Sequence, residues 1–277
     1  MFPRCFISFL LALILLAPLT AGEIIFNFID VGHGDAIFIE FPDQTTMLVD
    51  GGRIKKGKEV TAFISELGYK SLDYVVLTHS HDDHVGGLIE VIQFFPVKTL
   101  WCTPYAEEDE VIYANFMQLA ALKEIDIQCL TSGQKFSLAG VEIEILHPPY
   151  GKTLRQLGGP NGASLVMKLQ YGETACLLAA DIDSDTDRSL VKLYGDELKS
   201  VLLKCPHHGS SSSSSEEFLL AVAPQIAIIS TGPSKHNYPS DKTVERIKSL
   251  VSHVFRTDLD GTIIISLDGK NAEILQP

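Results

Sequence analysis

The chain has 277 residues, of which 45% are hydrophobic and 21% are charged. This length allows one large α/β domain or two small ones, and the composition is that of a globular protein with a sizeable core. The formal net charge of −13 repels polyanions at long range. It therefore weighs against broad, stable nucleic-acid binding, although a local basic groove is still compatible with it.

The first residues have the pattern of a secretory signal peptide. Arg4 precedes an apolar run over residues 6–16, and Pro18 and several small residues follow that run. The run is too short for a comfortable membrane span. We therefore expect a signal peptide at 1–22 and an exported (periplasmic or extracellular) mature chain at 23–277 with no integral membrane domain. The alternative is an uncleaved N-terminal membrane anchor.

Apolar runs and helical spacings along the mature part predict alternating strands and helices. Strands are expected near residues 24–29, 36–41, 46–49, 72–77, 98–102, 127–131, 141–146, 163–170, 174–179, 199–205, 225–230, 252–256 and 262–267. Helices are expected near residues 59–67, 85–92, 109–123, 184–194, 216–222 and 241–250. Opening strands followed by strand–helix alternation indicate an α/β fold of one domain, with helices on the outer faces of its sheets.

The motif His-x-His-x-Asp-His over residues 79–84 (the hexad) is the most informative feature of the chain. It lies between a segment that predicts a buried strand and one that predicts the start of a helix. Four of its side chains are good ligands for a divalent metal ion: His79, His81, Asp83 and His84. Imidazole and carboxylate together suit zinc, manganese or iron better than calcium. The hexad therefore predicts a metal site at a strand-to-helix junction.

Two further carboxylates end apolar runs and are expected near this metal site. Asp50 precedes two glycines at a strand end, so it can lie beneath the hexad and hold its histidines; a simple turn is the alternative. Asp181 directly follows a buried strand, where a charge is costly unless it is paired or bound to metal. Asp181 is the candidate for a carboxylate that bridges two cations.

The pair His207–His208 also follows an apolar strand, and Gly209 permits a tight path. We expect one histidine to bind metal and the other to shuttle protons or bind substrate. We assign His207 to the metal and His208, together with Asp83, to catalysis, although the residues alone do not separate the two histidines. A pair of satisfied core histidines is the alternative. The serine run that begins at Ser210 either offers donors to a phosphate oxygen or is a solvated loop.

Polar residues in other loops are candidates for supporting the ligands or for binding substrate. His33 and Asp35 lie in a glycine-rich turn that is either the rim of the site or only a hairpin. The other candidates are Asn161, Ser164 and His236.

Four cysteines belong to the mature chain: Cys102, Cys129, Cys176 and Cys205. Export would permit disulfides, but the four lie far apart in the sequence and mostly within apolar runs. Buried free thiols fit equally well, so no pairing is predicted.

With these motifs in order, the chain resembles metallo-β-lactamase-fold hydrolases and, more narrowly, is similar to the soluble hydrolase domain of ComEC-type competence (DNA-uptake) proteins. The resembling residues are 28–35, 48–52, 79–84, 146–149, 164–166, 181–182, 207–210, 256–258 and Gly261. The resemblance implies a four-layer αβ/βα sandwich with the metals at one sheet edge.

Two departures from the family pattern concern the site. The superfamily usually supplies a histidine between the hexad and the bridging aspartate, where this chain offers Asn161 and Ser164. The first metal position would therefore have only His79 and His81 as firm ligands, with water or a weaker ligand completing it. ComEC-type proteins also tend to carry Gly-His-Pro in the late proline loop, where this chain has Asn237-Tyr238-Pro239 with His236 displaced. In the opening motif they usually have glutamine where this chain has His33.

These residues predict a secreted metal-dependent hydrolase that uses a metal-activated water and one or two divalent ions, zinc or manganese. The resemblance favours a phosphodiesterase or nuclease that acts on a small-molecule or nucleic-acid phosphodiester. A hydrolase of esters, lactones or amides is the alternative within the same chemistry. The missing histidine motivates a third hypothesis, a catalytically weakened binding module.

Overall fold

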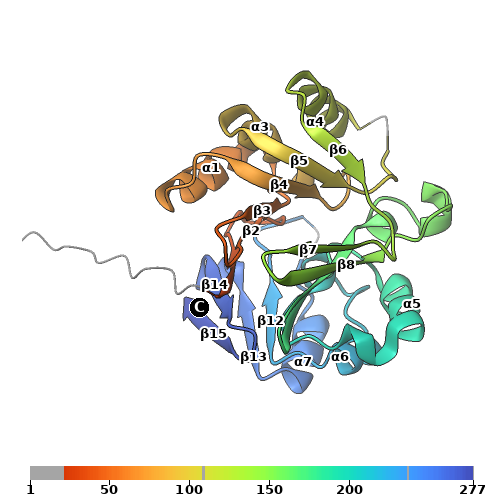
Figure 1. The fold of residues 1–277 in the computed structure, drawn as a ribbon. Coiled ribbons are helices and arrows are strands. Elements are labelled where there is room, and N and C mark those ends of the chain that lie inside the picture. Colours follow the sequence, from red (N-terminus) through yellow and green to blue (C-terminus); the bar gives the residue numbers. More distant parts are fainter. Residues whose placement is uncertain (1–21, 108–109, 236, 277) are drawn as a thin grey trace, which may run out of the picture.

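The computed structural model describes residues 22–107, 110–235 and 237–276. Apart from Gly22, the expected signal peptide lies outside the described residues, as does His236. The described chain forms two β-sheets that pack face to face, with helices on the outer face of each (Figure 1). This arrangement confirms the expected α/β fold, a four-layer αβ/βα sandwich.

The first sheet has eight strands among the described residues, in the order β15-β14-β1-β2-β3-β4-β5-β6. Strands β1 to β3 are antiparallel neighbours, and β3 to β6 run parallel. Their bounds are β1 Ile24–Phe28, β2 Ile37–Glu40, β3 Thr46–Val49, β4 Leu72–Leu77, β5 Val97–Cys102, β6 Asp126–Cys129, β14 Ile263–Leu267 and β15 Ala272–Gln276.

The second sheet has seven strands within the described ranges, in the order β13-β12-β11-β10-β9-β8-β7. Strands β7 to β10 are antiparallel neighbours, and β10 to β13 run parallel. Their bounds are β7 Lys135–Leu138, β8 Val141–His147, β9 Val166–Tyr171, β10 Thr174–Leu178, β11 Leu202–Lys204, β12 Ile226–Ile229 and β13 His253–Arg256.

The helices divide between the two outer faces (Figure 1). The first sheet is covered by α1 Gly57–Glu66, α2 Asp82–Val85, α3 Leu88–Phe94 and α4 Val111–Leu122, and the second by α5 Ser184–Tyr194, α6 Glu216–Val222 and α7 Asp241–Leu250. Short helices are α8 Thr257–Asp260, η1 Ile54–Lys56, η2 Leu154–Leu157, η3 Asn161–Ala163, η4 Gly195–Leu198 and η5 Pro206–Gly209. None of the helices in the described part of the chain is long and apolar enough to cross a membrane.

The side chains of β2 show how the layers join. Ile37 and Ile39 belong to the core between the two sheets, whereas Phe38 packs with the helices that cover the first sheet. Because successive residues of a strand face opposite sides, a strand buried on both faces must be apolar throughout. This is why continuous apolar runs identify the central strands of both sheets.

Every expected strand and helix has a counterpart. The helix expected near 85–92 is divided into α2 and α3, and the other differences concern the ends of elements. The sequence pattern does not predict β7 and β15, which lie at sheet edges and whose residues are only half-buried or exposed. The strand expected at 163–170 begins only at Val166, because Ala163 belongs to η3 and the N–H of Leu165 donates to the carbonyl oxygen of Thr78. Ser164 therefore lies in a loop.

Candidate functional site

The candidate residues meet at one edge of the sandwich, where strands of both sheets end. The parallel neighbours β3 and β4 precede Asp50 and His79, and the parallel neighbours β10 and β11 precede Asp181 and His208. The carboxyl ends of parallel strands meet at the same edge of a sheet, where ligand sites of α/β proteins form. Asp181 and His208 of the second sheet therefore face the hexad of the first.

Backbone contacts hold the hexad against the loop after β3. Gly51 donates its N–H to the carbonyl oxygen of His84, and Gly87 donates to that of Gly52, both at 2.8 Å. A Cβ atom on Gly87 would lie 1.9 Å from the carbonyl oxygen of Gly51, so this approach requires glycine. The contact fixes the position of His84 beside Asp50.

Two fully buried histidines each have one ring nitrogen bound to a fixed oxygen. Nδ1 of His84 lies 2.8 Å from Oδ2 of Asp50, and Nδ1 of His208 lies 2.9 Å from the carbonyl oxygen of Ser230. These acceptors select the tautomer with its proton on Nδ1, which leaves the Nε2 lone pair for another partner. Neither Nε2 atom makes a hydrogen bond with the described residues. This is the arrangement of a metal-binding imidazole.

His79 is oriented through a threonine. Its Nδ1 lies 3.1 Å from Oγ1 of Thr78, and that hydroxyl donates to Oδ2 of Asp50 at 2.7 Å. The backbone N–H of Thr78 donates to the other oxygen of Asp50 at 2.9 Å. The fully buried Asp50 therefore orients both His79 and His84.

His79 and His81 form the first position that can hold an ion. Nε2 of His79 lies 3.1 Å from Nδ1 of His81. With zinc–nitrogen bonds of about 2.0–2.1 Å, two ligands of one tetrahedral ion are about 3.3 Å apart. The observed separation fits a shared ion, and Oδ2 of Asp181 lies 4.0 Å from the same nitrogen of His79.

A second position surrounds Asp181. Its Oδ2 lies 3.3 Å from Nε2 of His84 and 3.2 Å from Nε2 of His208. Oδ2 of Asp83 lies 3.7 Å from the same nitrogen of His208. A buried carboxylate facing imidazole nitrogens is stable only with a proton or a cation among them. The donor set of imidazoles and carboxylates fits zinc or manganese.

The titration of the cluster reflects both burial and these contacts. Burial acts to raise the pKa of Asp181, but His208 and His84 outweigh it and hold that pKa well below its usual range. Burial acts to lower the pKa of His84, but Asp181 and Asp50 raise it well above its usual value. For His79, burial dominates and lowers the pKa. The cluster therefore favours a positive charge beside Asp181.

The structure separates His207 from His208. Both have left-handed backbone conformations, with φ of 51° and 52°, and their ring centroids are 6.3 Å apart. His208 is buried in the cluster, whereas Nε2 of His207 lies 3.2 Å from Nδ2 of Asn161. The geometry opposes the assignment made from the sequence. It favours His208 as the metal ligand and His207 as a residue of the rim.

Lys204 is a site residue that the apolar pattern of its strand concealed. Its fully buried ammonium group forms an ion pair with Asp35 and donates to the carbonyl oxygen of Ala180 at 3.3 Å. It also lies 3.8 Å from Oδ1 of Asp181. The sequence could have indicated this role, because a lysine within a buried strand is almost never without a charged partner.

The other predicted residues lie around the cluster. Nε2 of His33 is 2.9 Å from Oδ2 of Asp83, and the hydroxyl of Ser164 accepts the N–H of Asp181 at 3.4 Å. The hydroxyl of Ser210 lies 3.1 Å from another hydroxyl of the serine run. The structure thus brings His33 and Ser164 to the cluster and leaves the Ser210 hydroxyl in contact with its own loop.

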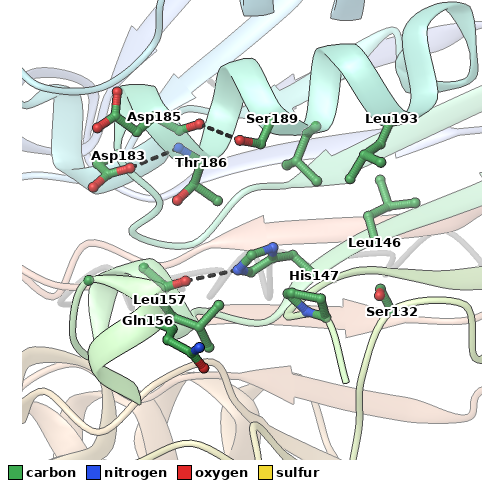
Figure 2. A pocket seen from close by; sticks show the side chains of 14 residues that line it. Ser132, Leu146, His147, Gln156, Leu157, Asp183, Asp185, Thr186, Ser189 and Leu193 are labelled. Carbon is green, nitrogen blue, oxygen red and sulfur yellow. Dashed lines mark hydrogen bonds between the residues drawn. The ribbon is translucent and has the colours of Figure 1, made fainter. Parts of the chain in front are cut away.

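A cavity of about 360 Å³ adjoins this site, between η2 and η3 on one side and α5 on the other (Figure 2). Its wall includes His147, whose Nε2 lies 2.8 Å from the carbonyl oxygen of Gly162. Asp183, two residues after Asp181, lies opposite His147 at the start of α5. Apolar side chains such as Leu157 complete the wall.

Known proteins similar to this chain include competence proteins. Residues 29–232 match the profile of the metallo-beta-lactamase superfamily. The chain is 27% identical to ComE operon protein 3 of Bacillus subtilis, over 94% of this chain and 34% of that protein. It is 29% identical to competence protein ComA of Neisseria gonorrhoeae, over 86% of this chain and 31% of that protein. It spans about a third of the length of these relatives.

Solved structures with the same fold include the metallo-beta-lactamase fold protein YhfI from Bacillus subtilis, with a TM-score of 0.55 and 14% identity over 89% of this chain and 100% of that one. CmlA, a diiron beta-hydroxylase from Streptomyces venezuelae, gives a TM-score of 0.56 and 14% identity over 90% of this chain and 54% of that one. At these identities the likeness concerns the fold alone. The profile match, the sandwich and the hexad agree, and the chain belongs to the metallo-β-lactamase superfamily.

Proposed function

We propose that the chain is an exported, metal-dependent hydrolase of phosphodiester bonds. The observation that carries this proposal is the cluster around Asp181. There, Nε2 atoms of His84 and His208 lie within 3.3 Å of one carboxylate oxygen and make no hydrogen bond with the described residues. Burying these groups without a cation would be costly, so the cluster is suited to binding one.

The ligands divide into two positions joined by Asp181. His79 and His81 would hold one ion, and the second position would use Asp83, His84 and His208. One or two divalent ions, zinc or manganese, suit these donors. A divalent cation at such a centre lowers the pKa of a water molecule towards neutrality and neutralises negative charge that develops on the substrate.

Side chains of the chain itself would position the substrate and move protons. Asp83 is the most accessible carboxylate of the cluster, with a side chain 16% exposed against 4% for Asp181. It is therefore placed to orient an attacking water and accept its proton. At the rim, His207 and Asn161 lie together and offer N–H donors to a substrate oxygen. Burial lowers the pKa of His207, which favours its neutral form and a hydrogen-bonding role.

The relatives support a phosphodiester as substrate. One is named competence protein ComA, and another, 26% identical over 90% of this chain, is named recombination protein 2, from Haemophilus influenzae. Competence and recombination are processes that act on DNA. We therefore infer a nucleic-acid or small-molecule phosphodiester, and the net charge of −13 favours transient contact with a polyanion over stable binding.

A thioester or ester is the second candidate substrate. The atrochrysone carboxyl ACP thioesterase of Claviceps purpurea is 29% identical to this chain, over 42% of this chain and 33% of that protein. The same ligand types can serve hydrolysis at a carbonyl carbon. The two substrate classes must therefore be compared directly.

The test uses purified protein loaded with zinc or manganese and three substrates: bis(p-nitrophenyl) phosphate, p-nitrophenyl acetate and an acyl thioester. We expect metal-dependent hydrolysis of the phosphodiester, lowered about 100-fold or more in His84→Ala and Asp181→Asn. His253→Ala is the matched control, because His253 is exposed on β13. Hydrolysis of the thioester alone would overturn the proposed substrate. Metal binding without any turnover would favour the binding-module hypothesis.

Export is proposed because residues 1–22 have the composition of a secretory signal peptide. The intact mass of the protein recovered outside the cytoplasm is expected to correspond to a start near residue 23. A full-length mass in the membrane fraction would instead indicate an uncleaved anchor.

A further inference from the structure

His33 lies in the loop between β1 and β2, and this loop packs against the hexad. The N–H of Asp35 donates to the carbonyl oxygen of Asp83 at 3.2 Å. Gly34 has a φ of 134°, and a Cβ atom there would lie 2.3 Å from the same oxygen. Glycine is therefore required for the loop to approach this closely. The approach leaves His33 only 7% exposed, beside Asp83.

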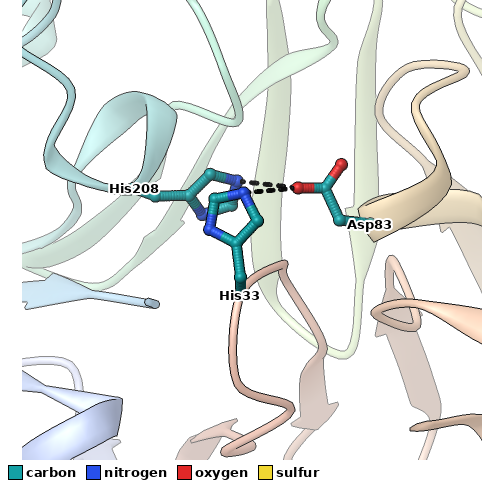
Figure 3. A group of neighbouring side chains, drawn as sticks. All are labelled: His33, Asp83 and His208. Atoms are coloured by element: carbon teal, nitrogen blue, oxygen red, sulfur yellow. Dashed lines mark ion pairs between the residues drawn. The ribbon is translucent and has the colours of Figure 1, made fainter. Parts of the chain in front are cut away.

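The side chain of His33 forms a group of three potential metal ligands with Asp83 and His208 (Figure 3). Nε2 of His33 lies 2.9 Å from Oδ2 of Asp83, and Nε2 of His208 lies 3.7 Å from the same oxygen. The two imidazole rings have centroids 4.5 Å apart. All three ligand atoms lie within 4.8 Å of one another.

We propose that His33 is a metal ligand, and that it binds the ion of the second position together with Asp83 and His208. This inference rests on the metal centre proposed above and adds a histidine that lies outside the hexad and outside the pair at 207–208. The first position has two histidines, His79 and His81. With His33 the second position is richer in imidazole and is expected to be the one that fills first with zinc or cobalt.

The separations are those of ligands around one ion. Bonds of about 2.0–2.2 Å place neighbouring ligand atoms about 3.0 Å apart in octahedral and about 3.4 Å apart in tetrahedral geometry. The observed 2.9 and 3.7 Å bracket these values. In addition, Nε2 of His208 is fully buried, points into the group and makes no hydrogen bond with the described residues.

A simpler role for His33 would be to donate a hydrogen bond to Asp83. The variant His33→Gln separates the two roles, because a glutamine amide can still donate an N–H but is a poor ligand for zinc or cobalt. His253→Gln is the matched control on an exposed histidine. His33→Asn, with a shorter amide, serves as a second variant, and far-UV circular dichroism of each metal-free protein checks folding.

The experiment titrates metal-free protein with Co²⁺ and follows the visible d–d absorption, with zinc calorimetry in parallel. We expect the first equivalent to bind about tenfold or more weakly in His33→Gln than in wild type, with an altered absorption spectrum. His253→Gln should match wild type within about twofold. Wild-type affinity and an unchanged spectrum in His33→Gln would overturn the role of His33 while leaving the metal centre intact.

A measurement on wild type avoids dependence on any variant. Protein with ¹⁵N-labelled histidine is loaded with one equivalent of ¹¹³Cd²⁺. The proposal requires a cadmium–nitrogen coupling at Nε2 of His33, whereas its absence, with couplings present at other histidines, would refute the proposal. If wild type binds neither cobalt, zinc nor cadmium, the proposed metal centre itself fails, and the ligand role of His33 fails with it.

Discussion

Lys204 and Asp35 form a buried ion pair beside the candidate metal-binding cluster. Their side chains are 1% and 2% exposed. Asp35 follows β1 of the first sheet, and Lys204 ends β11 of the second, so the pair joins the two sheets. Burial acts to lower the pKa of Lys204, but Asp35 and Asp181 outweigh it and raise that pKa. The lysine is therefore a permanent positive charge next to the carboxylates.

Removing this lysine is expected to destabilise the fold strongly. In Lys204→Met, Asp35 becomes a buried carboxylate without its cation, and the free energy of unfolding is expected to fall by about 3–5 kcal/mol. Urea unfolding of the metal-free protein measures this change. Lys199→Met is the control, because Lys199 is 61% exposed in a surface ion pair worth about 0–1 kcal/mol. If Lys204→Met lost no more stability than this control, the ion pair would have no structural role.

Asp50→Asn is expected to weaken metal binding while the fold is retained. The carboxylate accepts from Nδ1 of His84 and, at two oxygens, from Thr78. An amide can present an N–H where His84 needs an acceptor, which disturbs the tautomer that keeps Nε2 free. We expect a loss of about 10–100-fold in zinc affinity, measured by calorimetry. Asp196→Asn, on an exposed side chain, should leave the affinity unchanged; a similar loss in both variants would contradict this role of Asp50.

The titration of Asp187, which lies outside the candidate metal site, is expected to make the stability of the fold depend on pH. Burial raises its pKa to about 6, although Ser215 at the start of α6 donates two hydrogen bonds to it. Because the pKa is higher in the folded state, folding favours the protonated form. The contribution of Asp187 to the free energy of unfolding is fully present below about pH 4 and is lost as the pH rises through about 6.

The measurement is the difference in unfolding free energy between wild type and Asp187→Asn. Asparagine does not titrate, so we expect wild type to lose about 1–3 kcal/mol relative to the variant between pH 4 and pH 7. Titration of the metal-site histidines affects both proteins and cancels in the difference. A difference that stays constant with pH would show that Asp187 titrates normally.

Cys102 and Cys129 are expected to form a disulfide under oxidising conditions. They are paired residues of the parallel neighbours β5 and β6, and their Sγ atoms lie 3.4 Å apart. Cys129 is exposed, and a hydrogen bond from Cys102 lowers its pKa to about 6. The lowered pKa favours the thiolate of Cys129, the form that attacks disulfides.

With glutathione disulfide as oxidant, Cys129 would form a mixed disulfide and release one glutathione. Cys102 would then displace the second, joining the two strands. Peptide mapping by mass spectrometry should find the linked pair, while the buried Cys176 and Cys205 remain thiols. Cys102→Ser should stop at the mixed disulfide. Two free thiols at these positions after prolonged oxidation would refute the prediction.

The hexad could be recognised from the sequence because its ligands share one strand-to-helix junction, where spacing determines geometry. Sheets covered by helices could also be predicted, because strands buried on both faces need continuous apolar runs. The four-layer sandwich was implied by the family resemblance. The choice between His207 and His208 could not be made, since their left-handed backbone conformations depend on the loop around them. The approach of His33 to Asp83, the ion pair of Lys204 and the proximity of Cys102 to Cys129 required knowing which strands and loops are neighbours in space.

The ligands of the proposed centre come from both sheets, with the hexad on the first and Asp181 and His208 on the second. A bound ion would therefore be a cross-link between two halves that otherwise meet at this edge through buried polar contacts. Metal occupancy would then set the cooperativity of unfolding. A metal-depleted molecule would open at this edge first, and amide hydrogen exchange would accelerate there before it does at the opposite ends of the same strands.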